Sequence, residues 1–157
     1  MMPQPKVRPA TEDDCPALTN VALASKAFWG YSSDFMKACE SALTITPHMI
    51  EEWESGVIEE DGTIAGFYFV SFEPDEAELQ LLYISPLTMG QGYGRLLLGV
   101  AAQRAVQLGY ARMRIEADPN ALNFYKRMGA RQIGWCRSEI EDTRELPLLN
   151  LSLNSVK

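Results

Sequence analysis

The chain has 157 residues, of which 46% are hydrophobic and 22% are charged, and its formal net charge is −7. This length and composition are typical of one domain with a substantial core, so we expect a single domain over residues 1–157. The negative charge argues against a broad nucleic-acid surface, which needs a basic stripe, and no apolar run is long enough to span a membrane.

The beginning of the chain lacks the apolar centre of a signal peptide, so we expect a cytoplasmic protein. The three cysteines, Cys15, Cys39 and Cys136, are widely spaced and contain no Cys-x-x-Cys pair, which favours reduced, structural thiols. The single histidine, His48, is a poor candidate for a base or a metal ligand, and we expect no metal site.

The first part of the chain predicts a short strand at residues 7–9 and then a helix. Thr11 precedes three acidic residues, which is a typical helix start. The residues at helical spacing that we expect to face inward are Leu18, Val21, Ala22 and Ser25.

Gly30 ends this helix, and Ser32 or Ser33 can cap a second one. A short helix that contains His48 follows. Aromatic residues gather at the break between the first two helices, where such side chains usually pack helices onto a sheet. They are Trp29, Tyr31 and Phe35.

Three strands are predicted next, at residues 57–59, 64–72 and 79–84. The first two are joined through Asp61-Gly62, a strong signal for a β-hairpin. The third is almost entirely apolar, as expected for a central strand that is covered on both faces.

A glycine-rich turn, Met-Gly-Gln-Gly-Tyr-Gly at residues 89–94, then opens a helix over about residues 92–108. The first N–H groups of a helix have no internal partners, and glycines let an anion approach them closely. With Arg95 adding a charge, the turn indicates a phosphorylated ligand. No Lys follows the glycines, so a Walker loop is excluded, and the third glycine of a dinucleotide fingerprint is missing.

After this helix, whose inward face we expect at Leu97, Val100, Ala101, Ala105 and Leu108, the pattern predicts a strand at residues 112–118 parallel to the central strand. A helix capped by Asp118 and ended by Gly129 follows. Two strands at residues 132–137 and 148–153 close the chain, separated by a polar loop at residues 138–144.

Two motifs resemble the GNAT superfamily of N-acyltransferases. Residues 89–94 resemble its pyrophosphate loop, Gln/Arg-x-x-Gly-x-Gly/Ala, with matches at Gly92 and Gly94 and a departure at Met89. Residues 118–130, Asp-Pro-Asn-Ala-Leu-Asn-Phe-Tyr-Lys-Arg-Met-Gly-Ala, resemble its later Asn-Ala-x-x-Phe-Tyr-x-x-x-Gly helix. The motifs stand in the expected order with one strand between them.

The resemblance implies an α/β (α+β) GNAT fold: a mixed, mostly antiparallel sheet of about seven strands with a splayed parallel pair, flanked by about four helices. It implies acetyl-CoA as the cofactor, with the pantetheine arm on the backbone of the central strand and the pyrophosphate on the glycine loop. The cofactor-binding residues it implies are Leu82, Tyr83, Ile84, Met89, Gly90, Gln91, Gly92, Tyr93, Gly94, Arg95, Asn120 and Tyr125.

The implied reaction is direct transfer of an acetyl group to a primary amine of a small molecule or peptide. Tyr125 matches the tyrosine that protonates the leaving thiolate, although it also falls on an apolar helical face. Glu78 matches the glutamate that acts as base, directly or through water, and a solvated bystander is an equal alternative. A cysteine route is less attractive, because no thiol has a neighbouring histidine in sequence.

In this fold the first two helices form one wall of the acceptor pocket, so Trp29, Tyr31 and Phe35 are candidates for contacting substrate. Ser138 and Arg144 are candidates for binding an acceptor carboxylate, because the guanidinium group suits that shape. The acceptor itself stays open, and a homodimer is common among similar proteins. The alternative function is a catalytically silent module that binds coenzyme A as a sensor or partner protein.

Overall fold

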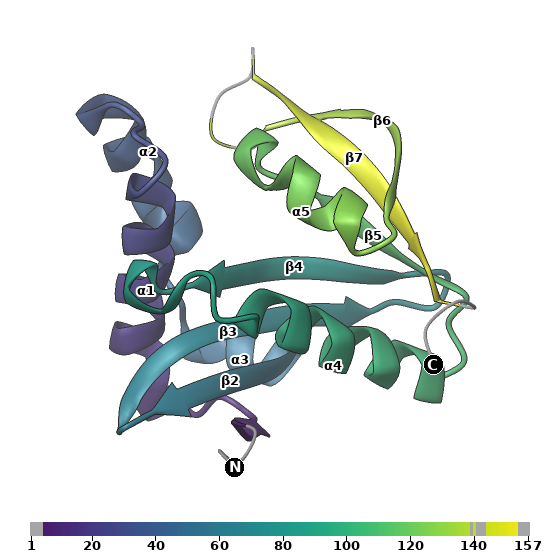
Figure 1. The fold of residues 1–157 in the computed structure, drawn as a ribbon, viewed down its shortest axis with the longest axis horizontal. Helices are drawn as coiled ribbons and strands as arrows, with labels where there is room; N and C mark the ends of the chain where they lie inside the picture. The colour runs from purple at the N-terminus through teal and green to yellow at the C-terminus, as the bar shows by residue number, and fades with distance from the viewer. Residues whose placement is uncertain (1–4, 139, 141–143, 154–157) are drawn as a thin grey trace.

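The computed structural model describes residues 5–138, 140 and 144–153, and within them the chain forms one seven-stranded sheet and five α-helices (Figure 1). The strand order is β1-β2-β3-β4-β5-β7-β6, in which β4 and β5 are parallel and the other neighbours antiparallel. The predicted mixed sheet with one parallel pair is confirmed.

The strands are β1 (Val7–Arg8), β2 (Glu54–Glu60), β3 (Thr63–Phe72), β4 (Ala77–Ile84), β5 (Arg112–Glu116), β6 (Arg131–Arg137) and β7 (Glu145–Ser152). The α-helices are α1 (Cys15–Ala27), α2 (Ser33–Leu43), α3 (Pro47–Glu52), α4 (Tyr93–Gln107) and α5 (Leu122–Arg127). Short 3-10 turns lie at η1 (Glu12–Asp14), η2 (Pro86–Thr88) and η3 (Pro119–Ala121). The short α3 helix accounts for five helices in place of the four expected.

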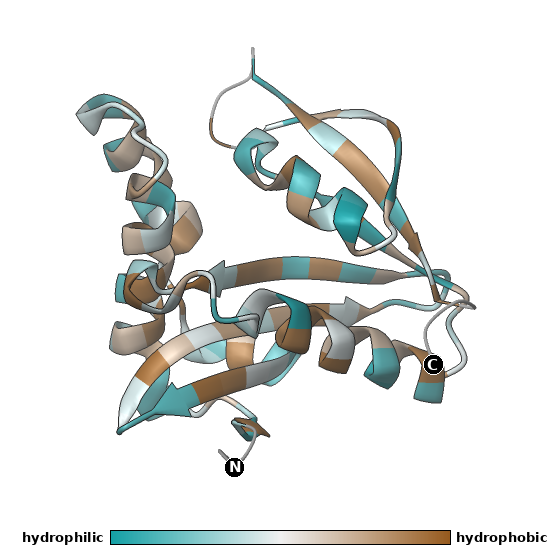
Figure 2. Cartoon of the chain, in the orientation of Figure 1, coloured by the Kyte–Doolittle hydropathy of each residue, from teal (hydrophilic) through white to brown (hydrophobic). Residues whose placement is uncertain are grey.

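Two hydrophobic clusters lie on opposite faces of β2, β3 and β4, whose apolar runs are brown in Figure 2. One cluster contains the inner face of α4 and reaches α5, and the other contains residues of α1, α2 and α3. The predicted faces of α1 and α4 are largely confirmed, since Leu18, Ala22, Leu97 and Ala101 are buried. Leu108 was wrongly included, because α4 ends at Gln107 and the Leu108 side chain is 45% exposed.

The hairpin between β2 and β3 is the predicted one: Glu60 pairs with Thr63, and Asp61 and Gly62 both have positive φ. β2, however, begins at Glu54, three residues before the predicted start. Its additional Glu-Ser-Gly segment has low strand propensity, and tertiary packing decides its conformation. Gly56 shows this plainly, because a Cβ there would lie 2.2 Å from the Tyr68 ring, which covers it.

The parallel pairing of β4 and β5 is short and ends inside both strands. Ala77, Glu78 and Leu79 pair with Met113, Arg114 and Ile115, respectively. Beyond these pairs β4 continues along β3 while β5 stays with β7, so the two strands diverge toward α1 (Figure 1). A register shift opposite Phe69 and Val70 leaves Gln80 as an extra residue, and such a bulge bends its strand where the divergence begins.

Local backbone features fix the break between α1 and α2. Ser32 accepts the N–H of Phe35 at 3.1 Å, and Gly30 takes the left-handed conformation with φ +85° that ends the preceding helical turn. None of the helices in the described part of the chain combines the length and the hydrophobicity that crossing a membrane requires.

At the N-terminal edge of the sheet, Asp14 joins three segments. Its carboxylate accepts the Arg8 guanidinium at 2.8 and 3.0 Å and the Thr11 N–H at 2.7 Å, and Arg8 also bonds the Glu59 carboxylate of β2. The Arg8 hydrogen bond in particular lowers the pKa of Asp14 to about 2.

We therefore expect acid to weaken the fold through Asp14. Because its pKa in the folded protein lies below the ordinary value of about 3.9, its contribution to stability is present above about pH 4 and is lost as the pH falls through about 2. Asp14→Asn should lower the free energy of unfolding by about 1–2 kcal/mol at pH 7 and by much less at pH 2, measured by urea titration. Exposed Asp13→Asn is the control, and an equal loss at both pH values for Asp14→Asn would contradict the expectation.

Candidate active site

A cavity of about 640 Å³ lies where β4 and β5 diverge. Its wall contains residues of α1, β4, the glycine loop, the end of β5, η3 and α5, so segments far apart in the sequence meet there. Twelve of the predicted site residues line it. They are Trp29, Leu82, Tyr83, Ile84, Met89, Gly90, Gly92, Tyr93, Gly94, Arg95, Asn120 and Tyr125.

One end of the cavity is the glycine loop. Gly90 and Gly92 have φ of +83° and +84°, and a Cβ at either position would meet no atom within 4 Å, so the space above these backbones is open. Gly92 is the residue before α4, whose first N–H groups have no intrahelical acceptors. With the guanidinium groups of Arg95 and Arg127 in the same wall, this end fits a phosphate group.

Neighbouring elements hold the loop in place. A Cβ on Gly94 would lie 3.2 Å from the Phe124 ring, so glycine lets the start of α4 approach α5 closely. The Tyr93 hydroxyl bonds the Glu60 carboxylate of the β2–β3 hairpin. Gln91 belongs to the loop but is exposed and does not line the cavity.

Besides Tyr93, the cavity wall contains two phenols, one buried and one half-buried. Tyr125 of α5 is only 7% exposed and packs edge-on against Phe124, with ring centroids 5.1 Å apart. Burial, and then the proximity of Tyr83, raises the pKa of Tyr125 above its ordinary value, and burial likewise raises the pKa of Tyr83. Both hydroxyls therefore keep their protons at neutral pH, which suits a hydrogen-bond donor.

β4 presents backbone to the cavity beyond its bulge. The edge that faces away from β3 has lost its β5 partner after Leu79, while Leu82, Tyr83 and Ile84 line the cavity. The extra residue, Gln80, donates its side-chain amide to the Ser71 hydroxyl at 3.0 Å, which ties the bulge to β3. Open strand edges of this kind bind extended ligands through main-chain hydrogen bonds.

Glu78, the predicted base, does not line the cavity. It is in the paired part of β4, its carboxylate is 3.8 Å from the Arg114 Nε, and it is outside the cavity wall. The structure does not bring it together with Tyr125, and its role as base stays a prediction. Two carboxylates do line the cavity: Glu116, at the end of β5 and 3.3 Å from Arg114, and Asp118.

Of the three aromatic residues proposed for the acceptor wall, only Trp29 lines the cavity. Its ring is 43% exposed and packs edge-on against Phe28 at 5.5 Å. Tyr31 and Phe35 lie outside the wall and pack on each other with centroids 4.5 Å apart. The Tyr31 hydroxyl donates to the Asp118 carboxylate at 2.8 Å.

Ser138 and Arg144, the candidates for an acceptor carboxylate, also lie outside the wall. Ser138 is buried, and its hydroxyl accepts the Ile140 N–H at 3.1 Å, so it shapes the start of the final loop. Residues 139 and 141–143 of that predicted loop lie outside the described residues. The Arg144 guanidinium donates to the Tyr31 hydroxyl at 2.6 Å.

Four charged residues of the wall are absent from the sequence-based prediction of the site: Lys26, Glu116, Asp118 and Arg127. Lys26 carried a usable signal, because it follows Leu18 and Ala22 at intervals of four and so falls on the buried stripe of α1. Asp118 was assigned a capping role, which is confirmed: its carboxylate accepts the Asn120 N–H at 2.8 Å. Asp118 also binds the side chains of Lys26 and Tyr31, and these contacts join residues that are far apart in the sequence.

The described residues hold no group of three or more potential metal ligands of the His, Cys, Asp or Glu types. The thiols show no activation either: Cys15 and Cys39 are buried, and burial raises the pKa of Cys136 to about 11. A reactive cysteine needs a lowered pKa, so these residues give no support to a covalent route.

Comparisons show what the chain is similar to. It matches the model of the acetyltransferase (GNAT) family over residues 25–130, which is more than half of the chain. A GCN5-related N-acetyltransferase from Rhodopseudomonas palustris has a TM-score of 0.82 at 20% identity, covering 97% of this chain and 98% of that one. PaiA N-acetyltransferase from Thermoplasma acidophilum, solved with coenzyme A, has a TM-score of 0.76 at 17% identity, covering 95% and 99%.

Among curated proteins, L-ornithine N5-acetyltransferase NATA1 of Arabidopsis thaliana is 38% identical over 80 residues. The match covers 45% of this chain and 35% of that protein, so the chain spans about a third of the length of this relative.

The glycine loop yields a stability prediction. An L side chain in the left-handed region costs about 1–2 kcal/mol, so Gly92→Ala should lower the free energy of unfolding by about that amount. Gly99 is the matched control, because it lies inside α4, where an added Cβ meets no atom within 4 Å. Gly99→Ala should raise the free energy of unfolding by about 0.5–1 kcal/mol. Urea titration measures both, and a stabilised Gly92→Ala would contradict the assigned loop conformation.

Proposed function

The chain belongs to the GNAT family of acetyltransferases, and we propose that it transfers the acetyl group of acetyl-CoA to a primary amine of a small molecule or peptide. The amine attacks directly, with both substrates bound together. The observation that carries this proposal is the cavity between β4 and β5, which joins an open glycine loop to a buried tyrosine.

The residues at the glycine-loop end suit the pyrophosphate of acetyl-CoA. The amides of Tyr93, Gly94 and Arg95 are in the first turn of α4, and the Arg95 and Arg127 side chains add positive charge. Met89 replaces the Gln or Arg of the family motif, and Arg127 in the same wall offers a second cation. The backbone of β4 from Leu82 to Ile84 offers main-chain hydrogen bonds to the extended arm.

Acetyl-CoA supplies an acetyl group already activated as a thioester. The chain supplies hydrogen bonds where charge develops. Backbone N–H groups beyond the β4 bulge can stabilise negative charge on the acyl oxygen, and a preorganised donor of this kind is worth about 3 kcal/mol. Tyr125 can donate its proton toward the sulfur. Since a phenol is a weaker acid than a thiol, we assign Tyr125 a hydrogen bond that strengthens as the thiolate forms.

The amine must lose its proton before it attacks, and Glu78 is the proposed base. Its distance from the cavity wall favours a relay through water over direct contact. Arg114 lies between the two carboxylates, 3.8 Å from that of Glu78 and 3.3 Å from that of Glu116.

The second candidate function is a coenzyme-A-binding module without catalysis. Met89 in the glycine loop and the place of Glu78 outside the cavity wall are the observations that favour it. Both functions use the same loop, so binding of acetyl-CoA does not separate them. Turnover does.

For the acceptor, we propose an amine that also carries a carboxylate. The curated relative acts on L-ornithine according to its name, and the Arg144 guanidinium, which donates to the Tyr31 hydroxyl, adds positive charge near the α1 end of the cavity. A guanidinium group pairs well with a carboxylate.

Tyr125→Phe tests the catalytic proposal. Loss of the hydroxyl should lower kcat at least about tenfold while the Kd of acetyl-CoA, measured by calorimetry, stays within about twofold, because the ring remains. Thiol release is followed over a panel of amines, amino acids and short peptides. A Tyr125→Phe variant as active as the wild type would remove Tyr125 from the mechanism, and coenzyme binding with no turnover of any amine would favour the silent module.

In the same assay, Glu78→Gln examines the base. A general base contributes about 10²-fold or more, so kcat should fall by that order with the affinity for acetyl-CoA unchanged. An unaltered kcat would show that Glu78 is not the base.

Arg144→Ala tests the acceptor class. Its KM should rise about tenfold more for L-ornithine than for 1,4-diaminobutane, which lacks the carboxylate, since a lost charge pair is worth at least that factor. Arg137→Ala, a change in an exposed arginine at the end of β6, is the control. Equal changes in KM for the two amines would remove the proposed contact with a carboxylate.

A further inference from the structure

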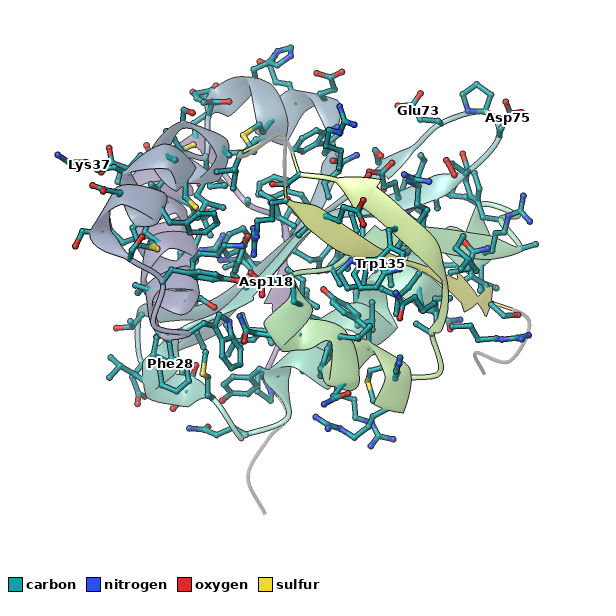
Figure 3. The ribbon with its side chains drawn as sticks, turned by 90° about the horizontal axis from the view of Figure 1, so that it is seen from above. Phe28, Lys37, Glu73, Asp75, Asp118 and Trp135 are labelled. Atoms are coloured by element: carbon teal, nitrogen blue, oxygen red, sulfur yellow. The ribbon has the colours of Figure 1, made fainter. Side chains whose placement is uncertain are left out.

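A polar cluster joins the first two helices to the C-terminal half of the sheet at the open side of the cavity. The Lys26 ammonium of α1 lies 2.5 Å from the Asp118 carboxylate, which follows β5. Tyr31, between α1 and α2, donates to the same carboxylate at 2.8 Å and accepts hydrogen bonds from Asn120 at 3.0 Å and Arg144 at 2.6 Å. Figure 3 shows Asp118 between the purple and blue helices of α1 and α2 and the green helix α5.

The central carboxylate is saturated with donors. Asp118 accepts from Lys26 and Tyr31, and it also receives the backbone N–H of Asn120 at 2.8 Å and its side-chain amide at 3.0 Å. Arg144 adds a charge 3.6 Å away. Burial alone opposes ionisation, but these partners, Lys26 first, outweigh it, and the pKa of Asp118 is lowered. Little capacity remains for an ammonium group of a substrate.

The cluster is also packed tightly against aromatic rings. The side chains of Lys26, Asp118 and Arg144 are 8%, 15% and 15% exposed. The Arg144 guanidinium lies 4.7 Å from the centre of the Phe35 ring, and the Lys26 ammonium lies 5.3 Å from that of Tyr31. Separating such a buried ion pair would leave an uncompensated charge in the interior. The pair therefore keeps the elements around it in one relative position.

The cluster connects the first two helices to the C-terminal half of the chain, next to the cavity. Between the described residues of α1, α2 and their connection and those of the C-terminal half, every side-chain hydrogen bond belongs to it. Lys26 and Asp118 line the cavity, and so does Trp29, which stands between Lys26 and Gly30. The cluster therefore fixes the end of α1, and Trp29 with it, against the α5 side of the cavity.

We propose that Lys26, Tyr31 and Asp118 form a polar clamp that sets the acceptor end of the cavity and thereby determines acceptor affinity. They are positioning residues, since Asp118 is occupied by its partners and Tyr31 lies outside the wall. The proposal rests on the proposed acetyl transfer, because it assigns the acceptor to the α1 side and the donor to the glycine loop.

Tyr31→Phe is the decisive variant, because it removes clamp hydrogen bonds without removing a residue of the cavity wall. It should raise KM for the acceptor about tenfold, with kcat and KM for acetyl-CoA changing less than about threefold, as expected for a displaced wall. Lys26→Met and Asp118→Asn should act in the same direction. The double variant should be about as impaired as the worse single one, since residues of one network do not act independently.

Hydrogen exchange of the unliganded protein provides a readout that does not need turnover. Each clamp variant should speed amide exchange about tenfold or more in α1 and α2 and leave α4 unchanged, because only the docking of the first two helices is loosened. Arg104→Met is the control, since it removes the exposed Arg104–Glu54 ion pair on α4 and should alter neither exchange in α1 and α2 nor KM.

The outcomes separate the two proposals. Unchanged exchange in α1 and α2 would overturn the clamp, whatever the activity. Faster exchange with unchanged acceptor KM would overturn its role in acceptor affinity, and a loss of acetyl-CoA affinity equal to that of the acceptor would do the same. Absence of turnover in the wild type, with normal exchange effects in the variants, would instead refute the proposed acetyl transfer.

Discussion

The active-site region depends on the early end of one strand pairing. β4 and β5 share a parallel ladder over three residue pairs and then separate after Leu79 and Ile115. Backbone N–H and C=O groups need partners, and the edge of β4 beyond Leu79 has lost its neighbouring strand. The bulge at Gln80 bends the strand at this point. An open strand edge thus lies in a cavity between a glycine-rich helix start and a buried tyrosine, an arrangement that suits a long, extended donor substrate.

The charge of the cavity wall near the glycine loop differs in sign from the net charge of the chain. The chain carries a net charge of −7, yet the lining residues near the glycine loop and α5 include Arg95 and Arg127. At the α1 end the ionic groups are paired, with Lys26 held by Asp118. Among the described residues Arg95 and Arg127 form no ion pair, so the glycine-loop end of the cavity carries positive charge beside open amides. At the proposed acceptor end, a hydrogen-bonded network whose charges largely neutralise one another fixes the shape of the cavity.

Local signals in the sequence were sufficient for much of this arrangement. The Asp61-Gly62 turn, the cap at Asp118 and the glycines of residues 89–94 act through their own backbone, so their structures follow from residue type. The polar start of β2 could not be predicted from residue type, because the Tyr68 ring packs directly on Gly56 and this contact forms only in the folded sheet. The same holds for Tyr31 and Arg144, 113 positions apart in the sequence, whose contact exists only once the sheet has formed.

The short β4–β5 ladder also has an evolutionary consequence. The glycine loop is supported by α4, α5 and the β2–β3 hairpin, whereas the proposed acceptor end depends on α1, α2 and their connection. If the proposed acceptor end is correct, mutations in α1 and α2 can change the amine while the supports of the glycine loop stay the same, so a new acceptor can evolve without a variant that has lost the donor.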